Sequence, residues 1–278
     1  MSIDHYENFP VASFLLPAHL REPIEAIYTF ARSADDIADE GDASAEQRLK
    51  QLATYRHALD AIETEGVAAA RGLPPFFARL TRCIIEHHLP LKPFHDLLDA
   101  FRQDVTKKRY EDFTDLLDYC RCSANPVGRL LLSLYGATAR ENFPFSDCIC
   151  TGLQLTNFWQ DVASDWNKGR IYLPRQDLAR FDISETDIAA SRCDERWQAL
   201  LAFEVARARA TLNAGAPLAR RLPGRIGWEL RLIVGGGLRI LDRIEAVGYD
   251  VFARRPRLGF ADKLSVAWYA LNYPRPRA

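Results

Sequence analysis

The sequence lacks a long apolar run, a secretory signal and a strong positive charge, which are typical of membrane-spanning, secreted and nucleic-acid-binding proteins respectively. No apolar run in its 278 residues approaches the ~18 residues that a membrane-spanning helix needs. The opening residues, MSIDHYENFP, lack the basic and apolar regions of a secretory signal. The formal net charge of −1 gives no electrostatic reason to expect nucleic acid as a partner. We therefore expect a cytoplasmic protein, at most peripheral to the inner membrane surface.

The cysteines also lack a metal-binding pattern. Two pairs read Cys-x-Cys, and residues two apart on a helix do not face each other. No Cys-x-x-Cys pair or adjoining histidine completes a zinc site. We expect six buried, reduced thiols, as in a reducing compartment. They are Cys83, Cys120, Cys122, Cys148, Cys150 and Cys193.

Alternating β-type runs and linkers are scarce, whereas helical periodicity is found along most of the chain. Apolar residues recur every three or four positions, and prolines fall mostly between these runs. No Ser/Gly-rich linker or internal repeat divides the sequence. We predict an all-α helical bundle that forms one domain over residues 1–278. The predicted helices are 21–40, 45–64, 74–88, 91–105, 113–123, 126–139, 145–166, 195–221, 225–247 and 259–271.

The stretch SADDIADE, residues 33–40, places four acidic residues directly after an apolar segment. On a helix, Asp35 and Asp39 lie on one face with their Cβ atoms about 5–6 Å apart, and Tyr28 and Arg32 share that face. Like charges at this spacing cost roughly a few tenths of a kcal/mol, which a divalent cation would offset. In isolation, such a pair at a helix end is usually solvated.

A second polar pattern lies in TGLQLTNFWQDVASDWNKGRIYLP. Gln154, Asn157, Asp161 and Asp165 fall within roughly 80° of one another on a helix, at about 100° per residue. Burying polar groups without partners costs on the order of 1–3 kcal/mol each. A solvated face would include Lys and Glu, and this line has neither. The pattern therefore indicates the wall of a cavity.

Two aspartate pairs that face each other across a bundle would suit Mg²⁺. This ion takes one or two carboxylates and completes its coordination with water and substrate phosphate oxygens. A di-iron bundle would need Glu-x-x-His pairs, and no histidine here has a glutamate three residues before it. A Gly-rich phosphate loop is also lacking, since 235–237 lies within a helical run. We therefore predict a cavity that binds a diphosphate through Mg²⁺.

The stretches YTFARSADDIADE, YCRCSANPVG and LQLTNFWQDVASDWNKGRIYLP resemble the squalene and phytoene synthases. Their order and spacing match over most of the chain, from about residue 7 to 255. The resemblance implies an isoprenoid-synthase bundle with a central apolar cavity, prenyl diphosphate substrates, and Mg²⁺ between the aspartate motifs. It implies metal-binding and catalytic roles for Asp35, Asp39, Asp161 and Asp165, assisted by Arg32.

Further residues match family positions that contact the substrate. Tyr28 lies beside the first motif, and Gln154 and Asn157 line the second. Arg170, in GRIYLP, matches a residue near the diphosphate, and Arg254 matches a C-terminal phosphate contact. A guanidinium fork suits phosphate oxygens by its geometry, which gives the arginine assignments a physical reason.

The sequence departs from the condensing members of the family at three places. Asn8, Phe9 and Pro10 replace a Ser-Phe-Ser type sequence, Gln160 replaces an arginine before Asp161, and Gly237 replaces a tyrosine. Losing the arginine removes a positive charge that could hold a second diphosphate, and losing the tyrosine is expected to open volume. These features resemble one branch, the bacterial hydroxysqualene synthases.

That branch implies conversion of presqualene diphosphate to hydroxysqualene and diphosphate, in squalene and hopanoid biosynthesis. Apolar walls, including Phe9, Phe158 and the 127–134 helix, would exclude bulk water from a cationic intermediate. One water must finally add to the cation. Asn157, Gln160 and Tyr172 are candidates for placing it, and the sequence does not rank them.

Two alternatives stay open. A head-to-head synthase that makes presqualene diphosphate or phytoene would be favoured by an arginine at position 160 and a Ser-rich flap. A non-catalytic, family-like assembly protein would have eroded aspartates, whereas all four are present. The implied partners are the prenyl diphosphate, water and, transiently, a membrane surface or other enzymes of the pathway.

Overall fold

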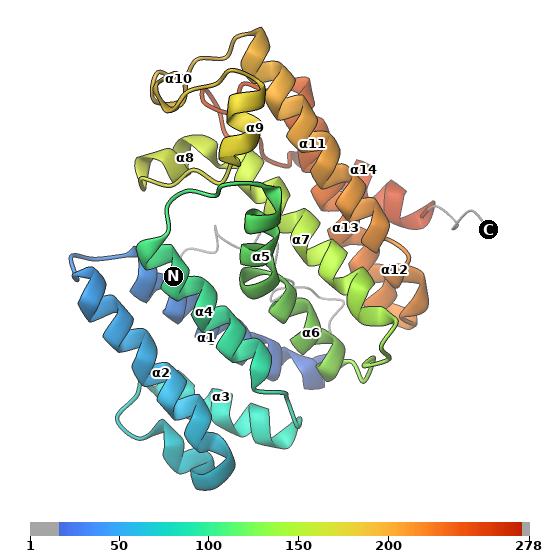
Figure 1. The fold of residues 1–278 in the computed structure, drawn as a ribbon. Coiled ribbons are helices and arrows are strands. Elements are labelled where there is room, and N and C mark those ends of the chain that lie inside the picture. The colour runs from blue at the N-terminus through green and yellow to red at the C-terminus, as the bar shows by residue number, and fades with distance from the viewer. Residues whose placement is uncertain (1–16, 274–278) are drawn as a thin grey trace. The chain divides into compact units, whose positions relative to one another are not determined.

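The computed structural model describes residues 17–273, so the substrate-binding position expected at Asn8 and the apolar wall expected at Phe9 lie outside the described residues. The described part consists of helices and loops without a β-strand, which confirms the predicted all-α class (Figure 1). Within residues 17–273, no helix is both long and apolar enough to cross a membrane. The helices divide into two compact units. The single domain over 1–278 and its central apolar cavity stay predictions.

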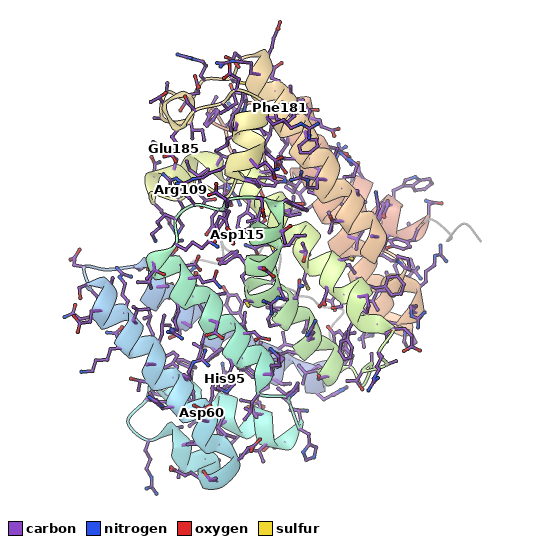
Figure 2. All side chains as sticks on the ribbon, in the orientation of Figure 1. Asp60, His95, Arg109, Asp115, Phe181 and Glu185 are labelled. Carbon is purple, nitrogen blue, oxygen red and sulfur yellow. The ribbon has the colours of Figure 1, made fainter. Side chains whose placement is uncertain are left out.

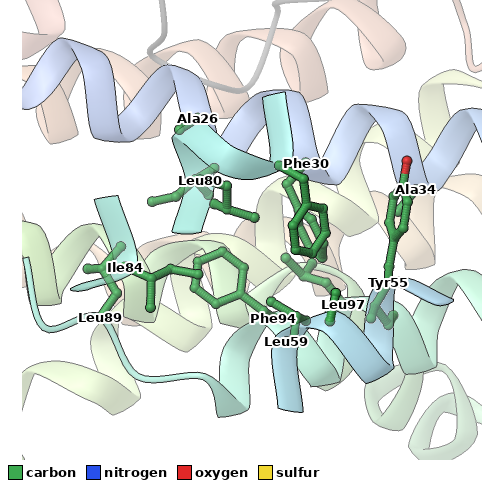
Figure 3. Packing of buried hydrophobic residues seen from close by; sticks show 14 of the residues in the cluster. Ala26, Phe30, Ala34, Tyr55, Leu59, Leu80, Ile84, Leu89, Phe94 and Leu97 are labelled. Atoms are coloured by element: carbon green, nitrogen blue, oxygen red, sulfur yellow. The ribbon is translucent and has the colours of Figure 1, made fainter. Parts of the chain in front are cut away.

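The first unit contains the described residues up to Lys107 together with 121–140. Its core lies between α1, α2, α3 and α4, where Phe30 packs edge-on against Phe94 with ring centroids 5.4 Å apart (Figure 3). Burying aromatic and aliphatic side chains of this size supplies most of the driving force for docking such helices. The elements are α1 (Ala18–Asp39), α2 (Ala45–Glu65), η2 (Gly66–Ala70), α3 (Pro75–Glu86), α4 (Lys92–Thr106) and α6 (Asn125–Leu134).

The second unit contains residues 108–120 and the chain from Glu141 onward. Its central pair, α7 and α11, approaches closely at Gly215, where a Cβ would lie 2.6 Å from the carbonyl oxygen of Phe145. The helix α5 (Phe113–Ser123) begins in this unit and ends in the first. The remaining elements are α7 (Asn142–Gln160), α8 (Val162–Asn167), α9 (Arg175–Arg180), α10 (Glu185–Ala189), α11 (Glu195–Gly215), α12 (Leu218–Arg221), α13 (Gly224–Ala246) and α14 (Phe260–Leu271).

Two predicted helices are each divided in the structure. The segment 145–166 breaks at Asp161, whose φ of −108° and ψ of 13° lie outside the helical region. The segment 195–221 breaks between Gly215 and Leu218, where Pro217 cannot donate the backbone hydrogen bond of a continuous helix. The short helices α9 and α10 were not predicted, because five or six residues are too few to establish a helical period.

All six cysteines are free thiols, as predicted, but only three are buried. Burial raises the pKa of the Cys120 thiol to about 12, which makes it unreactive near neutral pH. The expectation of burial is wrong for Cys148, Cys150 and Cys193, which are partly exposed. A cysteine follows local packing, and a Cys-x-Cys spacing does not specify which helix face is covered.

Candidate active site

The first aspartate motif occupies the last two turns of α1. The buried face of this helix includes Phe30, Ala34 and Ala38, and it packs into the core of the first unit. Asp35 and Asp39 fall on the other, partly exposed side. The same periodicity that buries the apolar residues therefore sets the two carboxylates side by side, as predicted.

Arg32 binds the acidic cluster from within the same helix. Its Nη1 donates to Asp35 at 3.2 Å, while Nη2 lies 2.7 Å from Asp36 and 2.9 Å from Glu40. Burial by itself would lower the pKa of Arg32, but the attraction of these carboxylates outweighs it, so the pKa is raised. Three carboxylates, those of Asp35, Asp36 and Glu40, thus lie around one guanidinium, which leaves the cluster negative and suited to a further cation.

Arg48 of α2 caps the end of α1, a contact that the sequence analysis missed. Its guanidinium donates to the carbonyls of Ile37 at 2.8 Å, Gly41 at 2.6 Å and Ala43 at 3.0 Å. The C-terminal end of a helix carries partial negative charge, and α1 has no basic residue in its last turn. Arg48 therefore stabilises the turn that carries Asp39. Its place in the sequence, beyond the helix end, gave no signal of this role.

The polar line of the second motif forms a partly exposed strip, and its role as the wall of a cavity stays a prediction. Within residues 151–160 of α7, only Gln154 and Asn157 are not buried, and Asp161 and Asp165 beyond them are also partly exposed. The prediction of one continuous helix is wrong at Asp161. However, the backbone N–H of Asp165 still donates to the carbonyl of Asp161 at 2.9 Å, so the strip continues through the break.

Arg255 contacts the second motif. Its guanidinium makes a two-pronged contact with Asp161, in which Nη2 donates to Oδ2 at 3.1 Å and Nε donates to Oδ1. The predicted phosphate contact, Arg254, is exposed, and its role stays a prediction. Sequence alignment alone could not choose between adjacent arginines, because an extended loop directs neighbouring side chains to opposite sides.

Gln160 holds the loop that carries Arg255. The side chain is only 2% exposed, and its Nε2 donates to the backbone carbonyl of Pro256. The amide that was predicted to touch substrate is therefore used within the protein. The hydrogen bond from Gln160 to Pro256 fixes the residue next to Arg255 and so holds Arg255 against Asp161.

A small cavity adjoins Asp165. Its volume is about 10 Å³, close to the space that one water occupies. Arg170 is buried here, and Tyr172 stacks on Phe158 with ring centroids 3.8 Å apart and planes 10° from parallel. The lining residues are Phe158, Val162, Asp165, Arg170, Ile171, Tyr172 and Leu173. The structure thus brings together a carboxylate, a guanidinium and an aromatic stack from the second motif and the GRIYLP segment.

Arg109 fixes the loop on which Arg170 lies. Its Nη1 donates to the carbonyl of Gly169 at 2.6 Å, while Nε and Nη2 donate to the Glu185 carboxylate at 2.7 and 2.8 Å (Figure 2). This bidentate pair raises the pKa of Arg109 chiefly through the hydrogen bond to Glu185. Sequence reasoning missed this residue, because its partners are 60 and 76 positions away.

The expectation that Gly237 opens volume is wrong. A Cβ at this position would lie 2.8 Å from Cδ2 of Leu153 and 3.1 Å from Cδ1 of Leu212. These two leucines, from α7 and α11, fill the space beside α13. Gly237 is therefore a close-packing position between three helices of the second unit.

The two aspartate motifs fit Mg²⁺ by the chemistry of their donors. Carboxylate oxygens are the ligands this ion prefers, and each motif supplies two. Between residues 17 and 273, no group of three or more His, Cys, Asp or Glu side chains forms a complete metal site by itself. An ion that shares its coordination between a carboxylate pair and diphosphate oxygens needs no such group.

Comparison with known proteins identifies relatives over most of the chain. The pattern of the squalene/phytoene synthase family matches residues 4–262. A hydroxysqualene synthase from Sinorhizobium fredii is 34% identical over 249 residues, which cover 86% of this chain and 80% of that protein. A phytoene synthase from Arthrospira platensis is 30% identical over 268 residues, covering 92% of this chain and 85% of that one.

A solved structure resembles most of the chain. The crystal structure of squalene synthase HpnC from Alicyclobacillus acidocaldarius matches with a TM-score of 0.79 at 39% identity. The match covers 88% of this chain and 90% of the other. The family match, over residues 4–262, therefore extends through both aspartate motifs.

Proposed function

Since the chain belongs to the squalene/phytoene synthase family, we propose that it converts presqualene diphosphate and water into hydroxysqualene and diphosphate. The family consists of isoprenoid synthases that process prenyl diphosphates, generally with a divalent metal ion. The proposal narrows this activity to one substrate that carries a single diphosphate.

The observation that carries the proposal is the burial of Gln160. The sequence resemblance gives condensing members an arginine at this position, whose charge would help to hold a second diphosphate. Here a neutral amide donates to the carbonyl of Pro256 and supplies no charge. A site that accepts one diphosphate needs fewer cations than a site that must hold two.

The first step breaks the carbon–oxygen bond to diphosphate. Asp35 and Asp39 of the first motif and Asp161 and Asp165 of the second would each hold Mg²⁺, which would supply positive charge to the leaving group. Arg32 and Arg170 add fixed positive charge beside these motifs. The bonding electrons leave with the diphosphate, and the cyclopropylcarbinyl cation that remains rearranges with opening of the ring.

Capture of the cation requires one water, and Asn157 is the residue we assign to place it. Gln160 is committed to Pro256, and Tyr172 is buried within the aromatic stack. Asn157 lies on the partly exposed strip, one turn before Asp161. Its carbonyl oxygen can accept a hydrogen bond from the water that forms the new carbon–oxygen bond. The released proton passes to solvent or to diphosphate.

The test is an end-point assay with Mg²⁺ and without reductant, followed by extraction and mass spectrometry. Presqualene diphosphate and farnesyl diphosphate are supplied in separate tubes. We expect an alcohol from the first and no product from the second. Conversion of farnesyl diphosphate to a cyclopropyl diphosphate would overturn the proposal in favour of a condensing synthase, which similarity to phytoene synthases keeps as the second candidate.

Substituting one aspartate in either motif tests whether both motifs are needed for turnover. Asp35→Ala and Asp161→Ala should each lower turnover by about a thousandfold or more, because each removes a charge that acts in the transition state. The controls are Asp42→Ala and Asp182→Ala, which remove exposed carboxylates outside the motifs. Near-normal turnover in either motif variant would contradict the two-motif assignment.

A further inference from the structure

Helix α14 carries a row of large apolar side chains that point to solvent. Phe260, Leu264, Trp268 and Leu271 are 79%, 59%, 68% and 64% exposed. At spacings of four, four and three residues, they lie along one face of the helix. Exposed apolar residues are usually scattered singly over a protein surface, whereas a contiguous row marks an interaction site.

The opposite face fixes this helix to the second unit. Asp262 is fully buried and accepts hydrogen bonds from Arg239 at 2.6 Å and Arg243 at 2.9 Å. Gly235 of α13 leaves room for Tyr269, since a Cβ there would lie 2.7 Å from its ring. Figure 1 shows α14 beside α13. The exposed row is therefore presented by an anchored helix and not by a frayed end.

The segment that carries the row is cationic. Arg254, Arg257 and Lys263 are exposed, and they precede or belong to α14. Asp262 is the one acidic residue in the sequence 254–273, and its carboxylate is enclosed by two arginines. This segment thus offers apolar and positively charged groups to solvent and no exposed carboxylate of its own.

We propose that α14 docks the protein onto an anionic lipid surface. A helix of this kind lies in the plane of the membrane, with its apolar row at the headgroup–acyl boundary and its cations near lipid phosphates. Tryptophan favours this interfacial layer. A two-fold contact with a second copy would instead bring the same cationic rim against itself. Attachment of this kind does not depend on the proposed reaction.

Vesicle co-sedimentation of the full chain tests the proposal. The probes are vesicles of phosphatidylcholine alone and of phosphatidylcholine mixed with phosphatidylglycerol. We expect binding to the anionic vesicles, about tenfold or more weaker for Leu264→Ser/Trp268→Ser. Lys263→Gln should weaken it by about fivefold. The matched control is Val67→Ser/Ile85→Ser, which removes two exposed apolar residues of the first unit and should bind as the wild type does.

Three further readouts separate the outcomes. Circular dichroism verifies that each variant is folded, and quenching by brominated lipid should be lost in Trp268→Phe, since Trp268 would lie at the interface. Equal binding by the α14 variant and the control would overturn the proposal. A second result would also overturn it. Light scattering without lipid would show a wild-type dimer that dissociates in Leu264→Ser/Trp268→Ser, and neither the wild type nor any variant would bind vesicles. In that case a second copy covers the row.

Discussion

Three consecutive glycines of α13 provide a direct test of how the second unit is packed. A Cβ on Gly236 would have Leu258 Cδ1 as its nearest neighbour, at 4.0 Å, which is an ordinary contact. A Cβ on Gly237 would lie 2.8 Å from Leu153 and 3.1 Å from Leu212. Alanine at either position changes helix propensity by the same amount. The two variants therefore differ in stability through side-chain packing alone.

The magnitudes predict that the two substitutions change the free energy of unfolding differently. Alanine is favoured over glycine within a helix by about 0.8–1.0 kcal/mol. Gly236→Ala should therefore raise the free energy of unfolding by about 1 kcal/mol. Overpacking a filled core costs typically about 1–3 kcal/mol, so Gly237→Ala should change it by about 0 to −2 kcal/mol. Leu212 cannot retreat toward α7, because it is already in close contact with Gly152.

Tryptophan fluorescence during urea denaturation is the appropriate assay. All five tryptophans belong to the second unit, so the signal reports on the unit that contains α13. We expect the transition midpoint to rise for Gly236→Ala and to stay or fall for Gly237→Ala. Equal stabilisation by both substitutions would refute the packing argument and restore the idea that Gly237 borders open volume.

Other predictions concern the candidate site and its surroundings. Arg109→Met should lower turnover by about tenfold while circular dichroism stays unchanged, since it frees the loop at Gly169; an unaltered rate would contradict the positioning role. Burial, outweighing the attraction of Arg207, raises the pKa of Glu204 to about 8. Because an unfolded glutamate releases its proton near pH 4, the free energy of unfolding should fall between about pH 4 and 8. Glu204→Gln should flatten this part of the stability curve, whereas parallel curves for wild type and variant would disprove the assignment.

The sequence by itself determined the fold class and the polar strip. Helical periodicity and proline positions predicted most helices, because burial of an apolar face imposes a period on the chain. Asp35 and Asp39 share a face for the same local reason. In α7, Gln154 and Asn157 were identified because they interrupt an otherwise apolar stretch, and they alone are not buried within residues 151–160.

Only the tertiary structure decided which distant groups meet. Arg48 caps α1, Arg109 holds the loop at Gly169, and Arg255 contacts Asp161 from 94 positions away. Arginine is long and its charge satisfies many partners, so its sequence position does not specify its contact. Gly237 is a second example. The sequence suggested open space beside it, but Leu153 and Leu212 of neighbouring helices fill that space. Periodicity is a local property that the sequence carries, whereas contacts between elements depend on how the elements dock.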